Sequence, residues 1–248
     1  MCWAFSTCSP CSIGAVRAIA VVVASKRAVS EASKSFEGTT LAGLQVHCWH
    51  QRFLVVEKPS GLLSQPGLGD AQSDSLITRV QAVRPELRLV HRLDRDTSGL
   101  LLLARDPESL KVLGGLFAER KVHKLYAADV CGHPTAHSGA VRLPLARLSA
   151  QPPRYGPHRD GRSCLTLWRC AQLGSARSRL WLAPRTGRSH QLRAHLAAIG
   201  LPVIGDPIYA ASGLGSPTER LHLHALGLSF SDPFSGQRIR VRSSLPWS

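Results

Sequence analysis

The chain has 248 residues, a formal net charge of +15 at pH 7 and a sequence pI of about 10.4. Hydrophobic residues make up 44 % and charged residues 19 %, which is typical of a globular protein with a substantial apolar core. The charge favours a polyanionic partner, a nucleic acid or an acidic membrane face; a basic surface without a partner is the alternative. A membrane span is not expected, because the longest apolar stretch, 13–24, is short and contains Arg17.

Seven irregularly spaced cysteines argue against a disulfide framework, since their number is odd. Cys8 and Cys11 form a single Cys-x-x-Cys pair with no second half, so a zinc site is not expected there. Reduced thiols and an intracellular location are the simpler interpretation.

The first segment, residues 1–43, differs in composition from the rest of the chain. It is rich in Ser and Ala, carries several basic residues, and has only Glu31 and Glu37 as acidic residues. This composition resembles an organelle transit peptide for a plastid or mitochondrion, and a poorly ordered basic arm is the alternative. A secretory signal is disfavoured because Arg17 interrupts the apolar stretch. If the segment is not a targeting peptide, a cytoplasmic location is expected.

Residues 44–248 are predicted to form one domain in which strands outnumber helices. Apolar runs and periodicity predict these elements, in chain order. They are a strand at Phe53–Val56, a helix at Ser73–Val83, strands at Leu87–Val90 and Leu100–Ala104, a helix from Asp106, strands at Lys124–Cys131, Leu165–Cys170 and Arg179–Leu182, a helix at Ser189–Ile199, and strands at Leu223–Phe230 and Ile239–Val241. Because helices and strands do not alternate strictly, we expect an α+β fold.

Local signals support the three predicted helices. Apolar residues of 73–83 fall on one face of a helix. Asp106 followed by Pro107 has the preferred order of an N-cap and a first-turn proline. Gly200 provides the stop for the third helix.

The segment most informative about chemistry is His91–Gly99, which reads H-R-L-D-R-D-T-S-G. It connects two apolar strands, so we expect a loop presented at the end of a sheet. Two carboxylates, two arginines and a histidine within nine residues are difficult to explain by packing. The alternative is a charged turn with local ion pairs.

Two further segments combine basic residues with a predicted helix or strand. Arg185–Arg193 places a basic turn directly before a helix start, where backbone N–H groups and the helix dipole favour anions. Arg188 in this turn is predicted either to bind phosphate or to hold a catalytic carboxylate. On the strand after Lys121, Lys124 and Tyr126 point to the same face. A core tyrosine is the alternative for Tyr126.

Taken together, these segments resemble the RluA family of RNA pseudouridine synthases. The His91–Gly99 loop is similar to the family signature H-R-L-D-x-x-T-S-G, and 124–126 is similar to its K-x-Y element. Residues 186–193 and 205–209 resemble T-G-R-x-H-Q-[IL]-R and G-D-x-x-Y, while 55–62 and 223–225 resemble V-x-K-P-x-G-L and L-H-A. The resemblance runs from about residue 45 to the C-terminus and is closest to the small subgroup without an S4 domain. One departure is Cys164, where the family often has Ala.

The resemblance implies a pseudouridine synthase catalytic fold, with a mixed, largely antiparallel central sheet flanked by helices. It implies isomerisation of uridine in structured rRNA or tRNA stem-loops, with the target base flipped out. Asp94 is the implied catalytic carboxylate, Arg188 its partner, and Tyr126 the residue that stacks on the uracil. Implied substrate-binding residues are Arg92, Leu192, His190, Arg193 and Lys124. We expect no cofactor, no metal, no membrane association and no obligatory protein partner, and a monomer.

Two other function classes compete with this interpretation. A non-catalytic RNA-binding protein would not need Asp94, Tyr126 and Arg188 together. A metal-dependent hydrolase would have to use histidines 190, 195, 222 and 224, but His190 and His195 are five apart and do not share a helix face. A glycosidase is disfavoured because its two carboxylates would both have to come from the His91–Gly99 loop.

Overall fold

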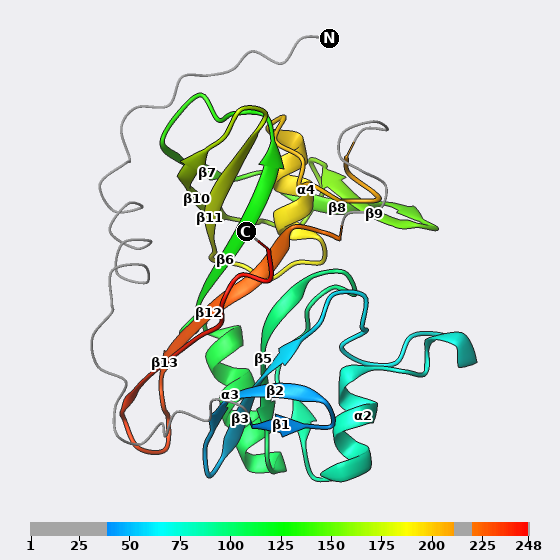
Figure 1. Cartoon of the computed structure of the whole chain (residues 1–248), viewed down its shortest axis with the longest axis vertical. Coiled ribbons are helices and arrows are strands. Elements are labelled where there is room, and N and C mark those ends of the chain that lie inside the picture. The colour runs from blue at the N-terminus through cyan, green and yellow to red at the C-terminus, as the bar shows by residue number, and fades with distance from the viewer. Residues whose placement is uncertain (1–38, 211–219, 248) are drawn as a thin grey trace.

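A mixed, largely antiparallel sheet of eleven strands forms the centre of the computed structural model, which describes residues 39–210 and 220–247 (Figure 1). The strands are β1 (Thr40–Leu41), β2 (Leu44–Trp49), β3 (Phe53–Lys58), β4 (Arg88–Leu89), β5 (Ser98–Ala104), β6 (His123–Cys131), β7 (Ser138–Val141), β8 (Leu145–Ala150), β9 (Pro153–Pro157), β10 (Thr166–Leu173), β11 (Arg177–Pro184), β12 (Leu223–Ser231) and β13 (Arg238–Arg242). The helices are η1 (Asp70–Gln72), α2 (Leu76–Val83), α3 (Pro107–Ala118) and α4 (Gln191–Ala198). The predicted α+β fold is confirmed.

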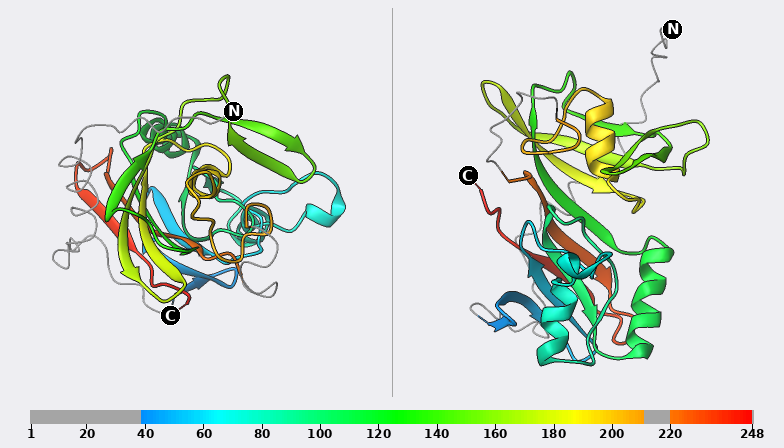
Figure 2. Two further views of the ribbon diagram at one scale, coloured as in Figure 1. Left: turned by 90° about the horizontal axis from the view of Figure 1, so that it is seen from above. Right: turned by 90° about the vertical axis from the view of Figure 1, so that its right-hand side faces the viewer.

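Strand β5 is buried along its whole length and is covered by a helix on each face. Its alternate residues Leu101 and Leu103 share a core cluster with α2, whereas Leu100 and Leu102 share one with Leu113 of α3. This two-sided burial explains why its sequence is a continuous apolar run and not an alternating one. In the other half of the molecule, α4 packs Leu196 and its neighbours against β6, β10 and β11 (Figure 2).

Strand β12 joins the two halves of the sheet. The main strand order is β1-β2-β3-β5-β12-β6-β11-β10-β7, with β13 paired to β12 and β4 to β5. β12 runs parallel to β5 through the pairs His224–Ser98 and Ala225–Gly99, and antiparallel to β6. The loop before β5 is therefore held at the seam between the halves. Gly99 has φ +113°, and a Cβ there would lie 2.4 Å from the Ala225 carbonyl oxygen, so the close approach requires glycine.

The structure refines several predicted boundaries. The helix predicted from Ser73 begins at Leu76, because Ser75 is its N-cap and forms a capping box with Thr78. Asp106 caps α3 as predicted. The sequence did not predict β1, β2, β7, β8, β9 or the short η1. Strands β8 and β9 pair in a separate two-stranded sheet.

Residues just before the predicted boundary at residue 44 take part in the sheet. Strand β1 pairs with β2, and Leu41 is only 7 % exposed within the core. The predictions made for residues 1–38, together with Cys8 and Cys11, lie outside the described residues. The four described cysteines form no disulfide bond with one another. Among the described residues, no helix has the length and apolar character needed to cross a membrane.

Candidate active site

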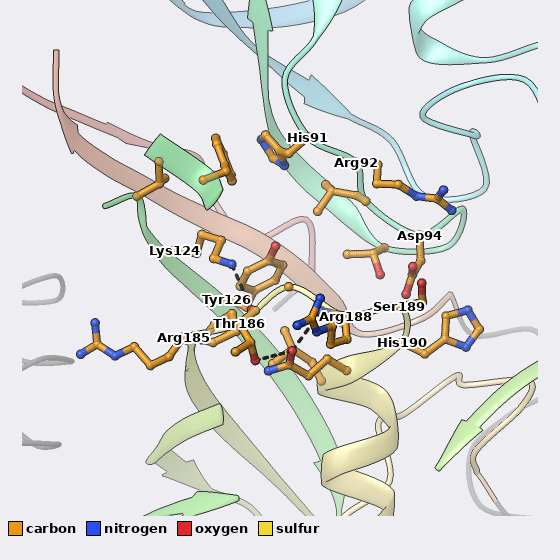
Figure 3. A pocket seen from close by; sticks show the side chains of 18 of the residues that line it. His91, Arg92, Asp94, Lys124, Tyr126, Arg185, Thr186, Arg188, Ser189 and His190 are labelled. Carbon is orange, nitrogen blue, oxygen red and sulfur yellow. Dashed lines mark hydrogen bonds between the residues drawn. The ribbon is translucent and has the colours of Figure 1, made fainter. Parts of the chain in front are cut away.

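A cavity of about 480 Å³ lies where the His91–Gly99 loop, the end of α3, β6, the turn before α4 and the first turn of α4 meet (Figure 3). Of the residues in 39–210 and 220–247 that line it, Asp94 is the one carboxylate, whereas six are lysines or arginines. The cations are Arg92, Arg120, Lys124, Arg185, Arg188 and Arg193. The sequence predicted three catalytic and five substrate-binding residues. All eight line this cavity.

The segment before α2 holds the backbone of the Asp94 loop in place. Ser64 Oγ donates to the Leu93 carbonyl at 2.7 Å and accepts from the Leu93 N–H at 3.0 Å. The fully buried Lys58 Nζ donates to the Arg95 carbonyl at 2.7 Å and to those of Pro59 and Leu62. Burial lowers the pKa of Lys58 to about 7, and Asp96 and Asp94 oppose that shift. Backbone groups of Leu93 and Arg95, the two residues that flank Asp94, are thus held by hydrogen bonds to buried side chains.

The guanidinium nearest Asp94 belongs to Arg193 and not, as the sequence led us to expect, to Arg188. Arg193 Nη1 lies 3.9 Å from Asp94 Oδ2, within ion-pair distance. Arg193 is 2 % exposed, so the interaction is only weakly screened by solvent. The predicted pairing of Arg188 with Asp94 is not formed in the structure, where Asp94 is within ion-pair distance of Arg193 and the Arg188 side chain is exposed at the cavity wall.

Asp206 fixes the position of Arg193. Its carboxylate accepts from Arg193 Nε and Nη2 at 2.7 Å each, a bidentate pair with both partners buried. The same carboxylate accepts the backbone N–H groups of Ile208 and Tyr209. Two of the three guanidinium nitrogens are therefore committed to Asp206, and the third faces Asp94.

The turn before α4 is organised by Gln191. Its side-chain oxygen accepts from the Thr186 hydroxyl at 2.7 Å and from the Arg188 N–H at 3.1 Å. Its amide group donates to Leu165 O and Thr166 Oγ1 on the neighbouring strand. The Arg188 backbone is thereby fixed, while its side chain is free to meet a ligand at the mouth of the cavity (Figure 3).

Tyr126 and Leu192 form an apolar wall inside the cavity. Both belong to the cluster packed around α4, and Leu192 is 7 % exposed. Burial, and then the charge of Asp94, raise the pKa of Tyr126 well above its usual value, so its hydroxyl stays neutral at pH 7. The two side chains can enclose a planar ring beside Asp94.

Lys124, His190 and Arg92 supply polar groups at the margins of the cavity. Lys124 Nζ donates to the Thr186 carbonyl at 3.1 Å, and burial lowers its pKa to about 8. His190 is the N-cap of α4 and has a left-handed conformation, φ 52°, with Nδ1 3.1 Å from the Tyr209 hydroxyl. Arg92 is exposed beside Asp94 (Figure 3). Their contact with substrate stays a prediction.

The histidines considered for a metal site have other partners. His195 lies between Thr166 Oγ1 and the Leu143 carbonyl, both at 2.9 Å. His222 faces Asp129, and His224 lies between Ser98 and Ser243. Within 39–210 and 220–247, no three His, Cys, Asp or Glu side chains gather at metal-binding spacing. The histidine set proposed for the hydrolase alternative is thus not brought together.

Three functional residues were not identified from the sequence. Lys58 and Ser64 hold the Asp94 loop, and Asp206 holds Arg193. A usable signal existed for Asp206, because it lies in the G-D-x-x-Y element and a buried carboxylate needs a cationic partner. No comparable signal distinguished Ser64 from any other loop serine.

The sequence matches the family model described as RNA pseudouridylate synthase over residues 52–198. Two relatives carry the name dual-specificity RNA pseudouridine synthase RluA. The protein from Vibrio vulnificus (strain CMCP6) is 42 % identical over 188 residues, covering 73 % of this chain and 75 % of that one. The protein from Escherichia coli (strain K12) is 38 % identical over 192 residues, covering 77 % and 88 %.

Solved structures agree with these sequence matches. Human RNA pseudouridylate synthase domain containing 1 superimposes with a TM-score of 0.71 at 26 % identity, covering 86 % of this chain and 88 % of that one. Human RNA pseudouridylate synthase domain containing 4 gives a TM-score of 0.67 at 22 % identity, covering 81 % and 88 %, which supports the fold.

Proposed function

Because this chain belongs to the RluA family of RNA pseudouridine synthases, we propose that it isomerises specific uridines in stem-loops of ribosomal or transfer RNA, with Asp94 as the catalytic carboxylate. The observation that carries the assignment of Asp94 is its position. Among the described residues it is the one carboxylate that lines the cavity, and the buried Arg193 lies 3.9 Å from it. The dual specificity named for the relatives supports the choice of RNA classes.

The reaction breaks the N1–C1′ bond of uridine, rotates the uracil and forms the C5–C1′ bond. No group is added, so a single ionised carboxylate is sufficient, acting as a nucleophile or as a proton acceptor on the sugar. Arg193 orients Asp94 from a fixed position, because Asp206 holds its other nitrogens. Both chemical routes are compatible with this geometry.

The apolar wall suits the uracil ring once the nucleotide has left the RNA stack. Flipping costs a few kcal/mol and is easiest in a loop, which favours a stem-loop substrate. Tyr126 and Leu192 enclose the base, and Arg92 at the mouth occupies the space the base leaves. Because the pKa of Tyr126 is raised, its neutral ring is suited to stacking on the uracil. Accepting the C5 proton would first require Tyr126 to lose its own proton.

Replacing Asp94 with Asn tests the proposal. We expect no isomerisation, measured as tritium release from RNA labelled at uridine C5, while RNA binding stays within about tenfold because the side-chain volume is retained. Asp96→Asn is the matched control, since Asp96 lies on the same loop but pairs with Arg95 outside the cavity. Substantial tritium release by Asp94→Asn would refute the assignment.

We also propose that the protein acts as an intracellular monomer, in an organelle if residues 1–43 direct import. The basic, acid-poor composition of that segment supports import. A fluorescent protein fused behind residues 1–43 should then co-localise with an organelle marker. Light scattering of the purified chain tests the monomer, and a dimer mass would contradict it.

A further inference from the structure

The cavity extends beyond Tyr126 to a second end, away from Asp94, that the reaction does not use. Lys124 and Arg185 lie at this end in Figure 3, and His123 contacts Arg185. Arg120, which follows the C-terminal end of α3, also lines the cavity, and we call these four residues the cationic end. In the close-up, Arg185 lies on the opposite side of Tyr126 and Thr186 from Asp94 (Figure 3). Resting on the function proposed above, we propose that the cationic end binds the backbone phosphate of a nucleotide that flanks the flipped uridine.

The charges at the cationic end lack acidic partners. No carboxylate of a described residue lies within ion-pair distance of Arg120, Lys124 or Arg185. His123 Nδ1 lies 3.5 Å from Arg185 Nη1, a contact between two groups that would repel if both were charged. The pKa of His123 is lowered by burial and then by Arg238 and Arg185, with no acidic group opposing the shift. A bound anion would reduce the electrostatic repulsion between these basic groups.

Arg120 occupies a backbone position that ordinarily favours glycine. Helix α3 ends in a Schellman motif, in which the Arg120 N–H bonds to Phe117 O and the Lys121 N–H bonds to Leu116 O. This places Arg120 at φ 60°, a left-handed conformation that costs a non-glycine residue about 1 kcal/mol. The exposed arginine side chain therefore lines the cavity from a strained position, as is common at functional sites.

The distance between Lys124 and Tyr126 matches the distance between a target uracil and the phosphate of the neighbouring nucleotide. Lys124 and Tyr126 are two residues apart on β6, which corresponds to roughly 7 Å along a strand. That distance is close to the length of one extended nucleotide. Lys124 uses one N–H for the Thr186 carbonyl, so its remaining protons are available to a phosphate oxygen. An RNA strand with its uracil against Tyr126 would thus carry a neighbouring phosphate into the cationic end.

Two substitutions test the site without damage to the fold. Arg120→Gly removes the cation and suits the left-handed position, so its thermal midpoint should equal or exceed that of the wild type. Arg185→Gln removes the second cation at a half-buried position. Lys111→Gln is the matched control, because Lys111 is an exposed cation on the same helix, α3, and does not line the cavity.

Binding of a stem-loop RNA that the wild type converts should weaken about tenfold for each cavity variant and less than twofold for Lys111→Gln. The slope of log K against log salt should fall by about 0.7 for each lost phosphate contact. The effect should be larger on the dissociation constant than on the single-turnover rate at saturating enzyme. Equal binding by the cavity variants and the control would overturn the proposal.

RNAs with one uncharged methylphosphonate near the target identify the phosphate. At one flanking position the wild type should lose affinity, and Arg185→Gln should lose nothing further. If Arg120→Gly and Arg185→Gln still weaken RNA binding by the same factor for every methylphosphonate position, the cationic end binds no single phosphate and the proposal fails. A wild type that converts no uridine would instead contradict the proposed function, which is a separate outcome.

Discussion

Replacing Arg193 with Lys tests the assignment of the partner of Asp94. Arg193 donates hydrogen bonds from Nε and Nη2 to Asp206 at 2.7 Å each, and its Nη1 still lies 3.9 Å from Asp94. A lysine ammonium retains the charge but cannot reproduce this three-point geometry. Losing one charge-assisted hydrogen bond in the buried pair should cost about 2–3 kcal/mol of unfolding free energy, a fall in Tm of roughly 5–10 °C. Loss of the orientation of Asp94 should lower the single-turnover rate at least about a hundredfold, roughly 2.7 kcal/mol on the barrier.

The assay is single-turnover conversion at saturating enzyme, at a temperature where near-UV circular dichroism shows the variant to be folded. Arg188→Lys is the control, because Arg188 is exposed and has no ion pair with Asp94, and it should keep its rate within about threefold. A slow Arg188→Lys beside a normal Arg193→Lys would refute the reasoning. If Arg193→Lys does not fold, Asp206→Asn leaves the arginine in place but weakens its anchor, and should still slow the reaction about tenfold.

Two further predictions concern the seam behind the site. Gly99→Ala should lower the unfolding free energy by about 3 kcal/mol in thermal melts, because residue 99 has φ +113° and its new Cβ would clash with the Ala225 backbone. Gly114→Ala on α3 is the control and should be neutral or stabilising, because there is open space around that position. The unfolding free energy should also fall by about 3 kcal/mol as pH drops from 6.5 to 4, because burial lowers the pKa of His224 from 6.5 to about 4 and the unfolded chain takes up the proton first. Denaturant melts of His224→Asn should show a flatter pH dependence, and an unchanged slope would contradict this explanation.

The sequence predicted the elements whose signals are local. The capped start of α3, the apolar run of β5 and the Gly stop after α4 all depend on residues close in the chain. Strands β8 and β9 were not predicted, because Pro152, Pro153 and Pro157 are residues typical of turns. The hairpin also depends on contacts with distant residues, such as the hydrogen bond that the Tyr155 N–H donates to the Tyr209 hydroxyl.

The residues predicted for the site all line one cavity, but the ion pair of Asp94 is formed with Arg193 and not with Arg188. Both Arg188 and Arg193 lie beside the start of α4, and the family resemblance led us to expect that Arg188 is the partner of Asp94. Which one reaches Asp94 depends on the left-handed turn at His190, which directs the following residues inward, and on the buried Asp206 13 residues further along. A buried guanidinium shared by two carboxylates is a tertiary arrangement that local patterns do not encode.

The central place of β12 also bears on how the protein is made. During synthesis, Asp94 and Arg193 emerge before residues 223–231, but β12 is the strand that lies between β5 and β6. Until it inserts, the nascent chain carries two unpaired apolar strand edges, which are prone to aggregate. The sheet can therefore be completed only when residues 223–231 have left the ribosome, and a chain terminated before β12 should be both insoluble and inactive.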